Sequence, residues 1–141
     1  MKKSNRLALY IGAGLVGLLI SASAVNAQEK PKGKPWAAPA EEASKKGPKV
    51  TPDILKAGKE LYNTNCKSCH GVKGKGDGEK AAKIEISCGD FTAADFNNES
   101  EGAQYYKITE GRKPMPSFKE KMSDAERWNV VAYIRSLKDA K

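Results

Sequence analysis

The chain has 141 residues, enough for one domain and no more. It carries 25 lysine and arginine residues against 17 aspartate and glutamate residues, a net charge of +8. A basic surface of this kind keeps a protein soluble or steers it toward acidic partners. No recognition-helix motif accompanies the charge, so the sequence predicts no nucleic-acid partner.

The first 27 residues have the pattern of a secretory signal. A positive start, an uncharged apolar run and a small-residue end follow in order, at Lys2, Lys3 and Arg6, at residues 7–20 and at Val25-Asn26-Ala27. This order predicts export to a bacterial periplasm with cleavage after Ala27. The alternative is an uncleaved inner-membrane anchor formed by residues 7–25, a length near the lower limit for spanning a bilayer. Contact with a membrane is expected only in that case.

Residues 28–50 have the composition of a linker. The segment is rich in proline, lysine and glutamate, and its only large apolar residues are Trp36 and Val50. Such a segment buries too little apolar surface to offset the entropy lost when it becomes ordered. Trp36 is its candidate point of docking onto the folded domain.

Three helices are predicted in residues 51–141, and no strand. Thr51 as N-cap and Pro52 at the first helical position begin the first helix. The second covers about residues 101–109, with Gly111 just beyond its end. The third begins at a capping box and then has apolar residues at helical spacing. Its residues are Ser123 and Glu126 for the box, then Val130, Tyr133, Ile134 and Leu137.

The chemistry of the chain is concentrated in Cys66-Lys67-Ser68-Cys69-His70. Two thiols three positions apart, at the end of a helix, can reach the two vinyl groups on one edge of a haem. The adjacent His70, the only histidine in the chain, then lies under the iron. The pattern predicts one covalently attached haem c, with Cys66 and Cys69 binding the porphyrin and His70 binding the iron.

Three other interpretations of this motif stay open. The first is a structural disulfide between Cys66 and Cys69, which leaves His70 unexplained. The second is a thioredoxin-like redox pair, which expects a βαβ pattern that this helical chain lacks. The third is a zinc site of Cys66, Cys69, His70 and Cys88, in which two neighbouring residues would have to point at one ion.

With this motif the chain resembles the class I cytochromes c, the family of small monohaem electron carriers. The resemblance covers about residues 51–138, the monohaem domain. It implies an all-α, cytochrome c-like fold of three to five helices around one covalently bound haem. The first and last helices would cross closely at Gly58, with Tyr133 near the crossing. The matching residues are Gly58, Tyr62, residues 66–71, Gly74, Gly76, Gly78, Gly111, residues 114–118 and residues 130–134.

The resemblance also names Met115 as the second axial ligand of the iron. A second histidine is not present in the chain, and a methionine thioether is accepted by haem iron in electron carriers, where it raises the reduction potential. Beyond residue 27 the methionines are Met115 and Met122. Met115 stands between two prolines, which suit a loop that presents one side chain rigidly. Met122 precedes Ser123, where a hydrophobic residue commonly packs as a staple, and is expected to fill the core.

The predicted function is electron transfer without catalysis, because filled axial positions leave no site for a substrate. An enzyme or ligand sensor would need an open sixth position on the iron. Lysines near the motif are expected to dock acidic surfaces of redox-partner proteins. They are Lys67, Lys73, Lys75, Lys119 and Lys121.

A glycine-rich segment and a third cysteine lie outside the attachment motif. The glycine-rich residues 71–78 are expected to form a loop near the haem edge with unusual backbone angles. Cys88 departs from the resemblance, because Pro-rich sequence is common before the pair seen here as Asp90-Phe91. A partly buried free thiol is expected at Cys88, with a disulfide-linked dimer as the alternative.

Overall fold

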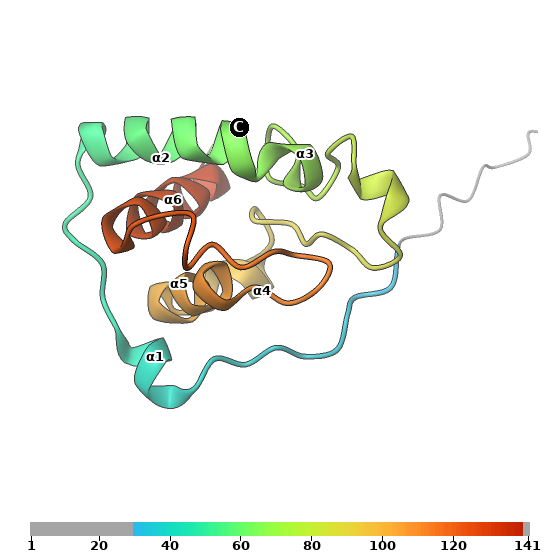
Figure 1. Cartoon of the computed structure of the whole chain (residues 1–141), viewed down its shortest axis with the longest axis horizontal. Coiled ribbons are helices and arrows are strands. Elements are labelled where there is room, and N and C mark those ends of the chain that lie inside the picture. The colour runs from blue at the N-terminus through green and yellow to red at the C-terminus, as the bar shows by residue number, and fades with distance from the viewer. Residues whose placement is uncertain (1–29, 140–141) are drawn as a thin grey trace, which may run out of the picture.

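The computed structural model describes residues 30–139, so the predicted signal at residues 1–27 lies outside the described part. Within that part the chain is helical, without a strand, and the all-α prediction is confirmed (Figure 1). No helix among residues 30–139 is long and apolar enough to cross a membrane. The α-helices are α1 (Ala40–Ser44), α2 (Pro52–Asn65), α3 (Lys67–His70), α4 (Ala94–Asn97), α5 (Glu101–Glu110) and α6 (Asp124–Ser136). Two 3₁₀ turns complete them, η1 (Ala81–Lys83) and η2 (Leu137–Asp139).

The three helices predicted from sequence correspond to α2, α5 and α6. The side chain of Thr51 accepts a hydrogen bond from the Ile54 amide at the start of α2. Ser123 and Glu126 form both halves of the predicted capping box at the start of α6. Local capping chemistry therefore sets where these helices begin, as the sequence indicated.

α2 and α6 form the principal helix pair of the domain, and their backbones touch at Gly58. A Cβ atom placed on Gly58 would lie 2.0 Å from the Asn129 carbonyl oxygen and 2.9 Å from the Tyr133 Cβ atom. Real Cβ atoms do not approach other atoms this closely, so only glycine fits. The close crossing predicted at Gly58, with Tyr133 beside it, is confirmed.

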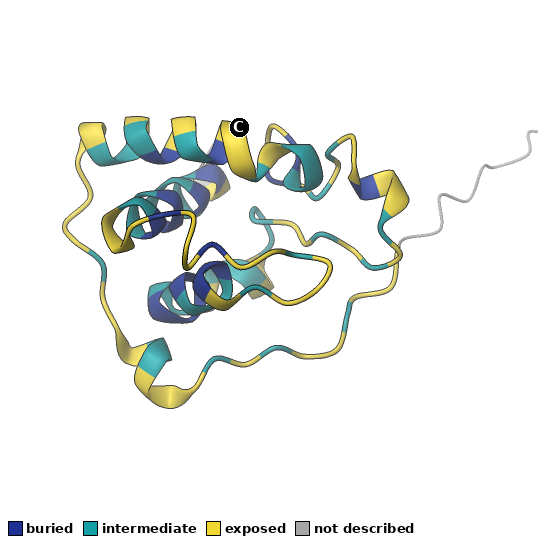
Figure 2. Ribbon diagram, in the orientation of Figure 1, coloured by how far each residue is buried: buried dark blue, intermediate teal, exposed yellow. Residues whose placement is uncertain are grey.

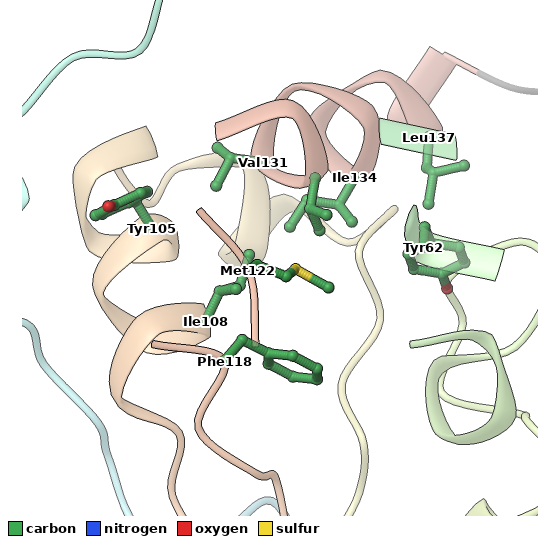
Figure 3. Close-up of a cluster of buried hydrophobic side chains, with 9 residues drawn as sticks. Tyr62, Tyr105, Ile108, Phe118, Met122, Val131, Ile134 and Leu137 are labelled. Atoms are coloured by element: carbon green, nitrogen blue, oxygen red, sulfur yellow. The ribbon is translucent and has the colours of Figure 1, made fainter. Parts of the chain in front are cut away.

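The hydrophobic core lies between α2, α5 and α6 and the loop that precedes α6. Figure 3 shows its side chains converging from these elements, and Figure 2 shows the dark buried residues on the inward faces of the helices. The members are Tyr62, Tyr105, Ile108, Phe118, Met122, Val130, Val131, Ile134 and Leu137.

Met122 is buried as predicted, but it does not form a staple. Only 5% of its surface is exposed. A staple needs a hydrophobic residue at the fourth helical position, and that position is Arg127. The guanidinium of Arg127 instead donates a hydrogen bond to the Met122 carbonyl oxygen at 2.6 Å.

The segment before α2 lies along the folded domain rather than apart from it. It runs around the lower margin of the domain in Figure 1 and carries α1 against α5. The Ser100 hydroxyl donates to the Ala43 carbonyl oxygen at 2.7 Å. A Cβ atom on Gly102 would lie 2.3 Å from the Glu42 carbonyl oxygen. Backbone contacts, more than buried apolar area, therefore hold this segment.

Replacing Gly58 with alanine is expected to destabilise the domain. Gly→Ala at an exposed helix position stabilises by about 1 kcal/mol, but here the added methyl group overlaps backbone atoms of α6. Overpacking of this kind costs about 2–3 kcal/mol. Denaturant unfolding of haem-loaded Gly58→Ala and of the exposed neighbour variant Lys59→Ala measures the difference. Lys59→Ala should stay within about 0.5 kcal/mol of the parent, and a stabilised Gly58→Ala would contradict the crossing.

Candidate functional site

One cavity of about 690 Å³ lies at the centre of the domain and is lined mainly by apolar side chains. Its volume is within the range of about 300–1,000 Å³ that is usual for small-molecule and cofactor pockets. We call it the central cavity. Its walls come from the end of α2, α3, the loop of residues 84–91, α4, α5, the loop of residues 112–118, α6 and residues 32–36.

The predicted haem-attachment motif opens onto this cavity. α2 ends at Cys66, whose amide donates to the Tyr62 carbonyl oxygen at 2.8 Å, and α3 follows at once. The buried Tyr62 hydroxyl donates to the Gly71 carbonyl oxygen at 2.6 Å. This bond ties the end of the motif back to α2. As a result Cys66, Cys69 and His70 all line the central cavity.

His70 has the properties of an uncharged ligand. Its ring stacks on Phe91, with ring centroids 4.6 Å apart and 24° between the planes. Burial lowers the pKa of His70 to about 4, with the backbone of Cys88 acting in the opposite direction. The buried Nδ1 atom has no hydrogen-bond partner. A neutral imidazole facing a cavity with an unsatisfied nitrogen fits a residue that binds a metal centre.

The three thiols of the chain share the cavity but are not bonded to one another. Cys66, Cys69 and Cys88 are free and half-buried. Burial, reinforced by Cys69, raises the pKa of Cys66 to about 12, and burial also raises the pKa of Cys88. The described residues contain no group of three side chains placed to hold a metal ion. The zinc interpretation therefore finds no support in this arrangement.

Met115 enters the same cavity from a restrained loop. Its amide donates to the Arg112 carbonyl oxygen at 2.9 Å, and the Ser117 hydroxyl donates to the Thr109 carbonyl oxygen at 2.6 Å. Gly111 begins the loop with a φ of 65°, where a Cβ atom would lie 2.4 Å from the Pro116 carbonyl carbon. Only glycine permits this tight turn. The loop presents Met115 rigidly, as its flanking prolines indicated.

Arg127 fastens the far end of that loop, a role that sequence reasoning missed. The side chain is 5% exposed and donates to the Lys119 carbonyl oxygen at 2.9 Å and the Tyr105 hydroxyl at 3.0 Å. Asp124 pairs with it at the helix start. A charge at the fourth position of a helix normally signals solvent exposure, so the sequence carried no sign of this contact.

The structure thus brings Cys66, Cys69, His70 and Met115 to one apolar cavity, together with Cys88. Two thiols and an adjacent uncharged imidazole are what attachment of a c-type haem needs, and a thioether is one common second ligand of its iron, so the residues fit that group. Sequence reasoning did not find the rest of the wall. It is formed mainly by Ile84, Ile86, Phe91, Phe96, Gln104, Ile108, Phe118 and Ile134.

Two sequence expectations take a different form in the structure. Gly71, Gly74 and Gly76 have positive φ angles as expected, but none of residues 71–83 lines the cavity. A Cβ atom on Gly76 would meet the Gly89 carbonyl oxygen at 2.6 Å, so this loop needs glycine for packing against its neighbours. The docking lysines are all exposed outside the cavity, and the cations that do line it are Lys32, Lys34, Lys107 and Arg112.

Comparison with known proteins identifies a matching family and several similar proteins. The family described as Cytochrome c matches residues 55–138. Cytochrome c6 from Diacronema lutheri is 30% identical over 82 residues, which are 56% of this chain and 90% of that protein. Among solved structures, the KustC0563 c-type cytochrome is 30% identical with a TM-score of 0.52, over 57% of this chain and 96% of its own.

A larger protein also contains a similar domain. A chain of the Kuenenia stuttgartiensis reducing HAO-like protein complex Kustc0457/Kustc0458 is 36% identical with a TM-score of 0.60. The similarity covers 65% of the present chain and 47% of that chain. The present chain therefore spans about half the length of this relative.

The number of free thiols in the haem-loaded protein tests the role of each cysteine. Thioether bonds would consume Cys66 and Cys69, so the reduced, desalted and denatured protein should titrate with a single thiol, Cys88. Cys88→Ser should titrate with none and keep its haem. Three titratable thiols in haem-containing protein would rule out covalent attachment. A non-reducing gel of the parent shows in the same experiment whether Cys88 links two chains.

Proposed function

Because the chain belongs to the cytochrome c family, whose members bind haem c covalently, we propose that it carries single electrons between redox partners in a bacterial periplasm. The observation that carries the proposal is the central cavity, where two thiols, His70 and Met115 meet. The signal pattern of residues 1–27 supports export. The uncleaved anchor of residues 7–25 is the alternative to a freely diffusing form.

We assign the haem contacts to four side chains. Cys66 and Cys69 would attach the porphyrin through thioether bonds, and His70 and Met115 would hold the iron. The haem iron supplies a reversible one-electron change when bound. The protein holds both axial ligands in place and keeps water from the metal. The uncharged state of His70 leaves a ring nitrogen free to bind iron at neutral pH.

The apolar wall of the cavity tunes the same chemistry. A low-dielectric surrounding disfavours the additional positive charge of oxidised iron and so raises the reduction potential. Phe91, Phe118 and Ile134 contribute such surface beside the ligands. The thioether of Met115 acts in the same direction.

The restrained loop of Met115 favours an electron carrier over a haem enzyme. An enzyme or sensor needs a vacant or easily vacated iron position. The loop is held at Gly111, at Ser117 and through Arg127. His70 is the sole histidine of the chain, so no second imidazole is present for distal acid–base chemistry.

Redox proteins are the proposed partners. The HAO-like relative is part of a protein complex, and cytochromes c exchange electrons by transient docking. We expect the exposed lysines around α3 and after the Met115 loop to attract an acidic partner.

The partly buried Met115 and the buried Met122 offer a matched test of iron ligation. Met115→Ala should remove the near-infrared charge-transfer band that thioether ligation gives to the oxidised protein. Met122→Leu should keep the band, because Met122 is a core residue, and should cost less than about 1.5 kcal/mol of stability. Visible and near-infrared spectra of the three proteins decide the assignment. Persistence of the band in Met115→Ala would show that another residue binds the iron.

Carbon monoxide separates the carrier from the enzyme interpretation. The reduced parent protein should not bind carbon monoxide, because Met115 occupies the sixth position. Met115→Ala should bind it readily, which is visible as a shift of the haem absorption. Rapid binding by the parent would point to an open iron and revive the enzyme interpretation.

Reversing the charge of the lysines should slow electron exchange with an acidic protein. The physiological partner is unidentified, so the probe is an acidic flavodoxin. Lys67→Glu, Lys73→Glu and Lys75→Glu together should lower the second-order rate about tenfold at low salt and flatten its salt dependence. Lys56→Glu with Lys59→Glu, two turns or more before Cys66 on α2, is the control and should change the rate little. Equal effects of both sets would contradict a localised docking face.

A further inference from the structure

Residues 30–36 form one wall of the central cavity, although they lie outside the region that matches the family. The family match covers residues 55–138, whereas Lys32, Gly33, Lys34, Pro35 and Trp36 all line the cavity. In Figure 1 this segment leads along the lower margin of the domain toward α1. We call residues 30–36 the strap.

The first end of the strap is fixed to the segment that carries Cys88. The ammonium group of Lys30 donates to the carbonyl oxygens of Ala81 at 2.5 Å and Ile84 at 2.6 Å. The Ser87 amide donates to the Pro31 carbonyl oxygen at 3.0 Å. These bonds join residues more than fifty positions apart and place the strap directly against the residues around Cys88.

The second end is fixed to α5 and to the loop of Met115. The guanidinium of Arg112 donates to the carbonyl oxygens of Lys34 at 2.9 Å and Pro35 at 3.2 Å. Its central carbon lies 4.7 Å from the centre of the Trp36 ring, and the Lys107 ammonium lies 5.8 Å from the same ring. Two cations on one indole are a cation–π arrangement. Arg112 is three residues from Met115 and accepts its amide hydrogen bond.

The middle of the strap passes close over the cavity wall. A Cβ atom on Gly33 would lie 3.2 Å from the end of the Ile86 side chain, so the strap packs closely against this part of the wall. The ion pair of Lys32 with Asp95 is largely exposed and contributes little. The strength of the strap therefore comes from its two ends, Lys30 and Trp36 with Arg112.

We propose that the strap is a functional part of the haem-binding site, closing the cavity between the Cys88 segment and the Met115 loop. It restricts the entry of small ligands to the iron and restrains the loop that must open before Met115 can be displaced. The inference rests on the proposed function, since it assumes that the cavity holds the haem. It assigns cofactor-site roles to Lys30, Trp36 and Arg112.

Imidazole binding to the oxidised, haem-loaded protein measures this closure. Trp36→Ala should bind imidazole about tenfold faster and more tightly than the parent, because the indole no longer holds Arg112 and Lys107. Trp36→Phe keeps a ring between the cations and should stay close to the parent. Lys46→Ala is the matched control, because Lys46 lies after the strap and its exposed ion pair with Glu101 is away from the cavity. Arg112→Gln gives a second variant of the same clamp should Trp36→Ala fold poorly.

Digestion with trypsin measures how readily the strap detaches from the domain, and this measurement does not depend on the iron. Within the strap only the Lys32–Gly33 bond is sensitive, because Lys30 and Lys34 each precede a proline. Trp36→Ala should be cut at this bond about tenfold faster than the parent, seen by mass spectrometry as a chain beginning at Gly33. Lys46→Ala and Trp36→Phe should be cut at the parental rate.

Imidazole binding and trypsin cleavage together test whether the strap belongs to the haem site. Faster cleavage with faster imidazole binding supports the strap as part of the haem site. Faster cleavage with unchanged imidazole binding overturns it, as does no change in either. A parent protein without the thioether band would contradict Met115 ligation alone. The difference between Trp36→Ala and the parent would still show whether the strap limits access to the iron.

Discussion

The close crossing of α2 and α6 at Gly58 is the constraint on which the rest of the site depends. α2 continues directly into Cys66 and α3, and α6 carries Ile134 in the cavity wall. Because the two backbones touch, the end of α2 and the inner face of α6 are held at one separation. The same helix contact therefore positions both the attachment motif and the hydrophobic core. A wider crossing would shift the thiols and His70 relative to the loop of Met115.

The loop of Met115 obtains its rigidity from hydrogen bonds rather than from secondary structure. Its start depends on Gly111 and its end on Arg127, a buried cation that binds two backbone carbonyl oxygens of the loop. Burying a charge is costly unless its donors are satisfied. Arg127 meets that condition at most of its nitrogen atoms, and Asp124 supplies a counter-charge. The result is a methionine presented from a fixed backbone, which suits a permanent iron ligand.

Two sets of residues form the cavity wall, one inside and one outside the region that matches the family. The part within the family match supplies the thiols, His70, Met115 and most of the apolar wall. The strap adds a further wall to the cavity, and cationic side chains hold the polar backbone of this wall in place. A domain of this size has a small core, so a haem filling the cavity supplies much of the apolar contact that holds the helices together. The strap contributes little to the hydrophobic core, because Trp36 is its only large apolar residue. Its main effect is to cover the cavity.

Local patterns in the sequence determined where the helices begin and indicated the side chains that we propose as haem ligands. Caps at Thr51 and Ser123 act within one turn, and the spacing of Cys66, Cys69 and His70 places all three at one helix end wherever the domain folds. Met115 followed from its flanking prolines and from the resemblance. Only the tertiary structure decided the roles of Arg127, of the glycine loop and of the strap. Those roles depend on contacts between distant segments, such as the bond from Arg112 to Pro35 across 77 positions. No local pattern records which carbonyl oxygen a distant side chain will meet, because that is set by how the helices pack.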